Sequence, residues 1–236
     1  MKAIIQAGGK GTRLRPYTHV MPKPLMPVGD LPVVEITLKY LRRWGIRDVF
    51  ITTGYLGHLI RSLCSDGHQW DMNISYTREP EPLGTVGALH LLNGNISETF
   101  LTLNGDLITD LNLRDFVNFH RQNGGILTIA ATQKVVKIDL GVLDCETHRM
   151  IGFREKPVMS FTVSMGIYCM EPELLEIIPR GVPFGFDDLV HELMSRGERI
   201  NVYEHHGLWL DIGREEDFMH AQNAFVKDFK CQVLGC

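Results

Sequence analysis

Short apolar runs alternate with helical apolar stripes along the first half of the chain. The runs that predict strands lie at residues 3–7, 49–53, 73–77 and 99–103. The stripes that predict helices lie between Pro32 and Gly45 and near residues 56–65, 85–93 and 113–122. Strands separated by helices of this length need crossover connections, so the pattern predicts a doubly wound, mostly parallel α/β sheet covered on both faces.

The second half of the chain is richer in strands. Strands are expected around residues 126–133, 140–145, 149–154, 162–170 and 200–204. Helices are expected near residues 186–196 and 214–229. We interpret this half as a lid over a substrate site.

Composition narrows the class of protein. The 236 residues suit one large α/β domain with appendages, and 44% hydrophobic residues are typical of a globular core. A net charge of -4 argues against a nucleic-acid partner. The chain shows neither a signal-peptide pattern nor an apolar run of about 18 residues, so no membrane partner is expected. Its five cysteines are odd in number and lack metal-type pairs, which indicates reduced thiols and a cytoplasmic protein.

Three glycines occupy residues 8–11 directly after the first expected strand, at the sheet edge where open α/β proteins bind ligands. Backbone N–H groups in such a turn can approach a phosphate closely. The cations around this turn are Lys10, Arg13, Arg15 and Lys23. The spacing fits neither the Walker motif nor the dinucleotide fingerprint. A plain tight turn would explain the glycines but not the cations, so the loop predicts a triphosphate site.

An acidic residue follows another expected strand. Asn104, Gly105 and Asp106 come directly after residues 99–103. Mg²⁺ commonly binds one or two carboxylates together with substrate phosphates, and Asp106 is placed to supply one carboxylate. The alternative is a turn in which Asp106 bonds its own backbone.

These residues resemble the motifs of the nucleotidylyltransferases that activate sugar 1-phosphates. The family hallmark Gly-Gly-x-Gly-Thr-Arg-Leu-x-Pro spans residues 8–16, and the following Pro-Lys-Pro spans residues 22–24. The resemblance implies a Rossmann-like, glycosyltransferase-A-like fold in a single catalytic domain, residues 1–236. Its expected parts are a nucleotide-binding part at about 1–125, a strand-rich sugar-phosphate-binding part at about 126–213, and a C-terminal helix at 214–229.

The resemblance also assigns the nucleotide site. In the family, the glycine-loop backbone holds the nucleotide phosphates, and the positions matching Arg13 and Lys23 neutralise their charge. The expected nucleotide contacts are Ala7, Gly8, Gly9, Gly11, Thr12, Arg13, Lys23, Gly84, Thr85, Asn104 and Asp106. Gly84 and Thr85 belong to a Leu-Gly-Thr-x-Gly string that lies against the base in the family, although a helix cap is their alternative role.

A second carboxylate comes from the string Trp209-Leu210-Asp211-Ile212-Gly213, which matches the family's Trp-x-Asp-x-Gly. The resemblance implies that Asp106 and Asp211 hold Mg²⁺ together. A helix cap is the alternative role for Asp211. The expected catalytic residues are Arg13, Lys23 and Asp106.

The sugar phosphate is expected to meet residues of the second half of the chain. By resemblance these residues are Gly141, Glu155, Lys156, Ser164 and Gly166. Many family members carry Asn where this chain has Ser164, so a hydrogen bond from this position has a shorter reach. On pattern alone, a Glu-Lys pair is usually a solvated surface.

The implied reaction joins a nucleoside triphosphate to a sugar 1-phosphate and releases pyrophosphate. The motifs favour GTP with a mannose- or heptose-type 1-phosphate. A thymidylyl-, uridylyl- or cytidylyltransferase acting on another sugar phosphate or phosphorylated small molecule stays open. A non-catalytic nucleotide-sensing module and a homo-oligomer also stay open.

Overall fold

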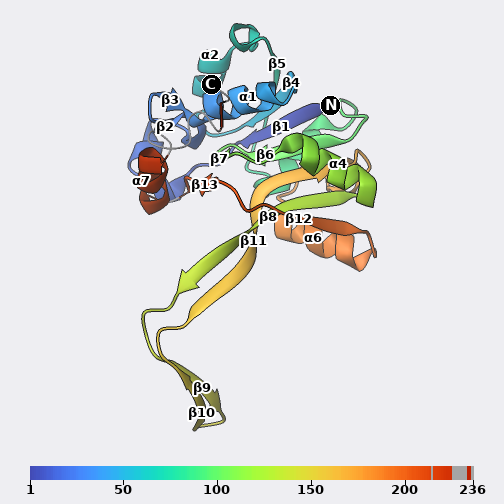
Figure 1. Cartoon of the computed structure of the whole chain (residues 1–236). Coiled ribbons are helices and arrows are strands. Elements are labelled where there is room, and N and C mark those ends of the chain that lie inside the picture. Colours follow the sequence, from blue (N-terminus) through green and yellow to red (C-terminus); the bar gives the residue numbers. More distant parts are fainter. Residues whose placement is uncertain (214, 225–232, 235–236) are drawn as a thin grey trace.

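The computed structural model describes residues 1–213, 215–224 and 233–234, and shows a central sheet with helices on both faces and a long two-stranded arm (Figure 1). The strands are β1 (Lys2–Ala7), β2 (Pro27–Val28), β3 (Leu31–Pro32), β4 (Asp48–Thr53), β5 (Asn73–Arg78), β6 (Phe100–Asn104), β7 (Leu107–Thr109), β8 (Leu127–Lys137), β9 (Val142–Glu146), β10 (Arg149–Arg154), β11 (Val158–Met170), β12 (Ile200–Glu204) and β13 (Trp209–Asp211). The helices are α1 (Val33–Arg43), α2 (Gly57–Cys64), α3 (Gly84–Gly87), α4 (Leu113–Asn123), α5 (Leu174–Ile177), α6 (Phe186–Ser195) and α7 (Glu215–Ala224).

The central sheet has the strand order β12–β8–β11–β6–β1–β4–β5. Parallel pairs join β1 to β4 and β6, β4 to β5, and β12 to β8. Among the described strands of this sheet, β11 runs against its neighbours β6 and β8. The expected mostly parallel α/β sheet is therefore confirmed.

Two adjacent residues of β1 show why helices cover both faces of the sheet. Ile4 and Ile5 are both fully buried, and neighbouring side chains of a strand point to opposite faces. Ile5 belongs to a core cluster with buried side chains of α1, α2 and α4. Ile4 belongs to another cluster, with those of α3, α5 and α6. The helices thus form a layer on each side.

Two expected helices differ in extent from the observed ones. The helix expected near 85–93 is one α-helical turn, α3, followed by a 3-10 turn at Ala88–Leu92. Glycines at 84 and 87 weaken the helix there. The described part of the C-terminal helix is α7, while residues 214 and 225–229 of that prediction lie outside the described residues. None of the described helices is long and apolar enough to cross a bilayer.

The strand-rich half does not form a separate lid. The inner ends of β8 and β11 lie inside the central sheet, between β12 and β6. Their outer ends leave the body as a ribbon that leads to the β9–β10 hairpin at the tip (Figure 1). The expected lid is corrected to an arm that points away from the body, because strands of 11 and 13 residues serve both the sheet and the ribbon.

Candidate active site

The glycine loop leaves the carboxyl end of β1 and is held by contacts of its own backbone. Gly11 has a left-handed φ of 59°. Its carbonyl accepts hydrogen bonds from the Thr18 hydroxyl at 2.8 Å and from the Leu14 N–H at 2.9 Å. Leu14 is buried and anchors the turn, while Lys10 and Arg13 are exposed. The two cations are therefore accessible to an anion above the loop.

Two aspartates far apart in the sequence meet through a short antiparallel pair of strands. β13 pairs with β7 so that Asp211 lies opposite Leu107, the residue after Asp106. The Ile212 N–H donates to the Asp106 carbonyl at 3.1 Å. Lys23 Nζ pairs with Asp106 Oδ2 and lies 4.0 Å from Asp211 Oδ1. The structure thus brings together three residues that the sequence had singled out, although their roles stay predictions.

The charges around Lys23 are suited to a cation. Burial lowers the pKa of the Lys23 ammonium to about 8, the Asp211 carboxylate opposes this fall, and the Arg13 guanidinium adds to it. Asp211 Oδ1 also accepts the Gly213 N–H at 2.8 Å. Two carboxylates around one ammonium form an oxygen-rich, negative centre of the kind that a hard cation binds.

This pair of carboxylates fits a site for Mg²⁺. Within the described residues, no group of three or more His, Cys, Asp and Glu side chains is placed to hold a metal ion. Mg²⁺ needs fewer protein ligands than that, because it commonly keeps water and substrate phosphates in its coordination shell. The number and type of ligands that Asp106 and Asp211 offer fit this cation.

Glu79 is a site residue that the sequence did not reveal. It follows β5 at the same sheet edge, and its carboxylate lies where a side chain on Gly8 would stand. Glu79 Oε2 accepts the Leu83 N–H at 3.0 Å. Burial raises the pKa of the Glu79 carboxyl, and the Leu83 hydrogen bond opposes this rise. The sequence shows only an acidic residue soon after an expected strand, which does not distinguish Glu79 from a solvated residue.

Gly84 and Thr85 make structural contacts with a later segment of the chain. Gly84 has a φ of 80°, and a side chain there would come within 2.6 Å of the Phe184 carbonyl oxygen. The Thr85 hydroxyl accepts the Phe186 N–H at 2.8 Å, at the start of α6. The helix cap predicted as their alternative role is absent from α3, which has no side-chain cap. The Thr85 hydroxyl instead ties the first residue of α6 to this turn.

The end of β6 packs closely against its neighbours. A side chain on Gly105 would come within 2.7 Å of the Gln6 carbonyl, and the Gly105 N–H donates to that oxygen at 2.9 Å. The Gln6 side-chain nitrogen is buried and has no hydrogen-bond partner among the described residues. A donor of this kind beside the glycine loop is consistent with a ligand at this edge.

Asn104, Ser164 and Gly166 lie together where β11 passes β6. Gly166 has a φ of 73°, and a side chain there would come within 2.5 Å of Asn104 Nδ2. The Gly166 N–H donates to the Ser164 hydroxyl at 3.2 Å. The Trp209 indole donates to the Met165 carbonyl at 3.0 Å and thereby fixes β13 beside this point. These three predicted residues form one wall next to the strand that carries Asp211.

The other predicted sugar-phosphate residues lie on the arm. Glu155 and Lys156 follow β10, and Gly141 precedes β9, so all three belong to the hairpin end that Figure 1 shows away from the body. Lys156 Nζ pairs with Asp139 at 3.2 Å. A side chain on Gly141 would collide with the Phe153 ring at 2.7 Å. The structure does not bring these residues to Asp106.

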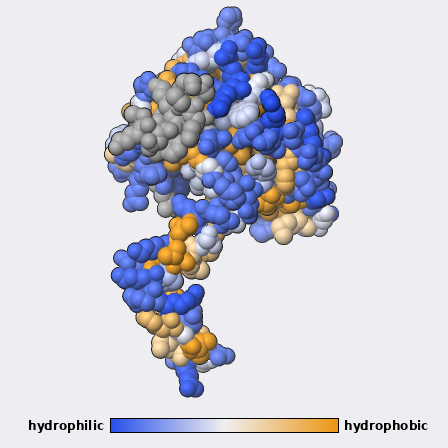
Figure 2. All heavy atoms as spheres, viewed as in Figure 1, coloured by the Kyte–Doolittle hydropathy of each residue, from blue (hydrophilic) through white to orange (hydrophobic). Residues whose placement is uncertain are grey.

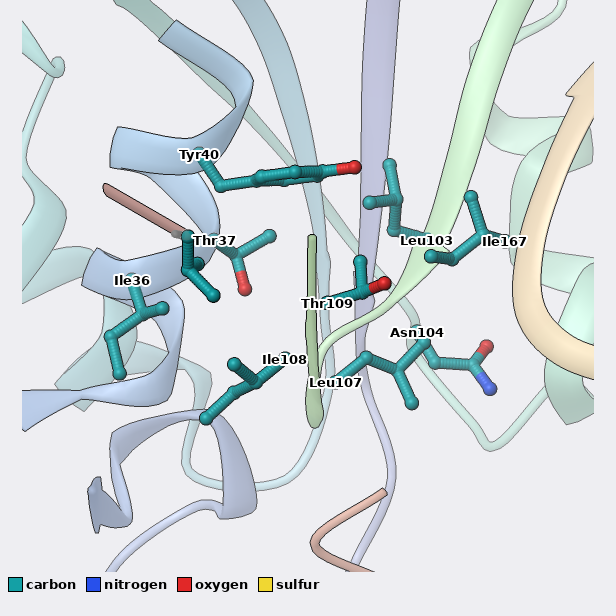
Figure 3. A pocket seen from close by; sticks show the side chains of 10 residues that line it. Ile36, Thr37, Tyr40, Leu103, Asn104, Leu107, Ile108, Thr109 and Ile167 are labelled. Atoms are coloured by element: carbon teal, nitrogen blue, oxygen red, sulfur yellow. The ribbon is translucent and has the colours of Figure 1, made fainter. Parts of the chain in front are cut away.

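A small cavity in the core lies behind the site. Its walls come from α1, β6, β7 and β11, and Figure 3 shows Tyr40 across its top and the Asn104 side chain pointing away from it. Its volume is about 10 Å³, which accommodates one water at most. The cavity is therefore a packing defect of the core, and the ligand site is the open sheet edge.

Residues 2–228 match the family model described as nucleotidyl transferase. The chain belongs to this family. The hallmark glycine loop, the lysine and the two aspartates described above all lie within the matched residues.

Named relatives differ in their nucleobase. A UTP–glucose-1-phosphate uridylyltransferase of Synechocystis sp. is 33% identical over 94% of this chain, which covers 62% of that protein. The mannose-1-phosphate guanylyltransferase catalytic subunit beta of Danio rerio is 31% identical over 99% of this chain, which covers 67% of that protein. This chain therefore spans about two thirds of the length of these relatives.

Solved structures share the fold. One described as a glucose-1-phosphate thymidylyltransferase of Bacillus anthracis superposes with a TM-score of 0.77 at 25% identity, over 99% of this chain and 98% of that one. HddC from Yersinia pseudotuberculosis superposes with a TM-score of 0.75 at 24% identity, over 95% of this chain and 99% of that one. The second likeness concerns the fold alone.

Proposed function

We propose that this chain is a sugar-1-phosphate nucleotidylyltransferase that transfers the guanylyl group of GTP to a mannose- or heptose-type 1-phosphate. The observation that carries the proposal is the meeting of Lys23, Asp106 and Asp211 at the sheet edge that carries the glycine loop. A phosphate oxygen of the sugar attacks the α-phosphorus of GTP. The bond from that phosphorus to the bridging oxygen breaks, and pyrophosphate leaves with the electron pair.

Charge cancellation and alignment are the protein's main contribution, because both reactants are anions. Backbone N–H groups of residues 8–12 and the Arg13 guanidinium are assigned to the triphosphate. Lys23 is also assigned to the reacting phosphates, and its ion pair keeps Asp106 in place. No protein nucleophile is needed for a direct in-line transfer.

Mg²⁺ is the cation that we assign to Asp106 and Asp211. When bound, it neutralises charge on the phosphates. The chain's part is to hold both carboxylates in place, through Lys23 at Asp106 and the Gly213 N–H at Asp211.

Glu79 supports guanine as the base. A carboxylate accepts hydrogen bonds only, and the Watson–Crick edge of guanine presents two adjacent donors, N1–H and the N2 amino group. Glu79 Oε1 lies beside Gly8, and Oε2 keeps a lone pair beyond the one that accepts from Leu83. Uracil and thymine offer a single donor on that edge between two carbonyl oxygens, which the carboxylate would repel.

The sugar phosphate is assigned to the wall formed by Ser164 and Gly166. The glycine leaves room next to Asn104, and we assign the nearby Ser164 hydroxyl to a sugar hydroxyl. Gly141, Glu155 and Lys156 stay assigned to the same substrate, although they lie on the arm.

A cytoplasmic location and a single catalytic domain complete the proposal. Cys64, Cys145 and Cys169 are free thiols, which suits a reducing compartment. Both core clusters pack on the same sheet, which supports assigning the nucleotide part and the sugar-phosphate part to one domain.

The test is pyrophosphate release from the purified chain with Mg²⁺, each of GTP, dTTP, UTP and CTP, and a panel of sugar 1-phosphates. The expected result is release with GTP and a mannose- or heptose-type phosphate, abolished in Asp106→Asn. Release that favours another triphosphate would overturn the base assignment. Absence of release in every combination would overturn catalysis and favour a nucleotide-sensing module.

A further inference from the structure

The arm carries a mainly apolar face, which also holds Lys134 opposite Phe161 and Thr132 opposite Val163. Its apolar side chains are only partly covered by the described residues. Directly opposite residues of an antiparallel pair share a face, and the register places Val136 opposite Met159. Alternation along β11 adds two more residues to that face, Phe161 and Val163. Phe161 is 46% exposed and Val136 is 41% exposed. A face of this kind normally packs against a core.

The opposite face of the same ribbon is largely polar and internally bonded. The Gln133 amide donates to the Thr162 hydroxyl at 2.9 Å, and the Ser160 hydroxyl donates to the Gln133 carbonyl oxygen at 3.0 Å. Val135 and Val158 also lie on this face, toward the outer end. An isolated two-stranded ribbon is marginally stable in water, so an amphipathic one is expected to bury its apolar face.

The tip of the arm adds further exposed apolar side chains. More than half of the surface of each is accessible in Leu140, Leu143, Met150, Ile151 and Phe153. Figure 2 shows apolar residues at the root and the tip of the arm among hydrophilic ones. Exposed apolar side chains that gather on one arm, rather than being scattered singly over the surface, indicate an interaction site.

The arm also separates parts of one site. Glu155 and Lys156 are assigned to the sugar phosphate, yet the arm holds them away from the body that carries Asp106. The ribbon from Ala131 to Lys137 alone spans about 20 Å at the usual rise per residue, and the hairpin extends it further. The arm is therefore long enough to reach a neighbouring body of similar size.

A place to receive such an arm lies beside Asp211. An open hollow of about 330 Å³ is bounded by residues 132–135 at the arm's root, by β13 with Asp211, and by Asp217 and His220 of α7. The hollow lies at the root of the arm. If the arm of a second copy ran antiparallel to this arm, the tip of that second arm would reach the hollow.

We propose that two copies of this chain exchange arms and complete each other's active sites. The apolar faces of the two arms pack on each other across a two-fold axis, an isologous contact that uses the same residues twice. Each tip seats in the hollow of the other copy, where Glu155 and Lys156 meet the sugar phosphate beside Asp211. The proposal rests on the proposed function, because that function assigns these two residues to the substrate.

Complementation between two inactive chains tests the exchange. Chains with Lys156→Ala and chains with Asp106→Asn are co-expressed with different tags, and the mixed dimer is isolated through both tags. One site of this dimer combines an intact body with an intact arm from the other chain, so about half of wild-type turnover is expected while both parent dimers stay inactive. A mixed dimer without activity would mean that each arm serves the body of its own chain. A fully active Lys156→Ala chain would mean that the arm takes no part in the site. Either result overturns the proposal.

Oligomeric state supplies a readout that a purely catalytic role of Lys156 would not move. Phe161→Ser is expected to convert the dimer to a monomer in light scattering, because it makes the apolar face polar. Thr162→Ser is the matched control, because Thr162 is the next residue along β11 and its side chain lies on the opposite face of the ribbon. This variant is expected to stay dimeric. A wild-type monomer, or a dimer indifferent to Phe161→Ser, overturns the proposal.

Crosslinking separates failure of the inference from failure of the proposed function. A benzophenone tethered to the exposed Cys145 of β9 is activated in a mixture of ¹⁵N-labelled and unlabelled copies. Arm exchange predicts crosslinks between the Cys145 peptide of one isotope and residues 207–224 of the other. Crosslinks confined to one isotope overturn the exchange. Because the crosslinking readout does not depend on activity, it decides the exchange whether or not the chain releases pyrophosphate.

Discussion

Glu79 lies half-buried against the glycine loop, and its protonation state should be visible in nucleotide binding. Burial raises the pKa of its carboxyl above the ordinary value, so the group gains a proton at a higher pH than an exposed glutamate does. A protonated carboxyl loses an acceptor for guanine. We expect GTP affinity to weaken as the pH falls from neutrality toward this raised pKa, measured by titration calorimetry.

Replacing Glu79 by Gln tests the same contact without changing its shape. The Gln amide places an N–H donor against the donors of guanine. GTP affinity should therefore fall about 10- to 100-fold, as expected for the loss of a charged hydrogen bond. The affinity should also no longer weaken as the pH falls. Glu81→Gln, on an exposed residue of the same turn, is the control and should leave binding unchanged. Equal GTP affinity in Glu79→Gln would contradict the base assignment.

Arg13 is expected to act on the transition state. Its side chain is exposed above a turn that Leu14 anchors, so its removal should leave the fold intact. Arg13→Ala should cost about 3 kcal/mol of transition-state stabilisation, comparable to one preorganised donor, which is roughly a 100-fold fall in kcat/KM. Arg196→Ala, at the exposed residue directly after α6, is the matched control. Near-normal turnover in Arg13→Ala would remove Arg13 from catalysis.

The contrast between these residues shows what the sequence can reveal. Arg13 and Asp106 could be identified because each belongs to a local motif at the end of a strand. Glu79 could not, because its role depends on the contact with Gly8 across two strands of the sheet. A single glutamate in a proline-rich turn has no spacing that distinguishes it from a solvated residue.

Helix α4 gives a prediction at the level of secondary structure. The Asn112 side chain accepts the N–H groups of Arg114 and Asp115 at 3.1 and 3.2 Å and so caps the helix. Asn112→Ala should lower the free energy of unfolding by about 1 kcal/mol in urea denaturation. Asn118→Ala makes the same chemical change at an exposed mid-helix position, where the higher helix propensity of Ala should leave stability equal or raised. Equal losses in both variants would exclude a cap.

The pairing of β7 with β13 shows how one element can decide a site. Each strand has three residues, too short to be recognised from an apolar pattern, whereas the long strands of the central sheet were predicted within a few residues. Yet this pairing sets Asp211 beside Asp106. The sequence could name both aspartates through a family resemblance, but the physical link between them appears only with the pairing.

For the molecule as a whole, the direction of the arm is the feature that the sequence could not predict. The strand pattern at 140–145 and 149–154 is matched by β9 and β10. Alternation along a strand, however, states only that one face is apolar, and not which surface covers it. The same pattern suits a lid folded over the chain's own site and an arm that reaches another copy.

Removing the tip of the arm separates its packing from its chemistry. Replacing residues 138–157 by Asn-Gly joins Lys137 directly to Val158, which are paired in the ribbon, through a two-residue turn of the type that hairpins favour. The removed residues belong to neither core cluster, so thermal unfolding of the body and GTP affinity should stay close to wild type. The apolar face with Phe161 remains, so the shortened chain should still dimerise. Guanylyl transfer to the sugar phosphate, followed as pyrophosphate release, should be lost because Glu155 and Lys156 are gone. Full pyrophosphate release by a folded, shortened chain would show that the tip has no part in the reaction.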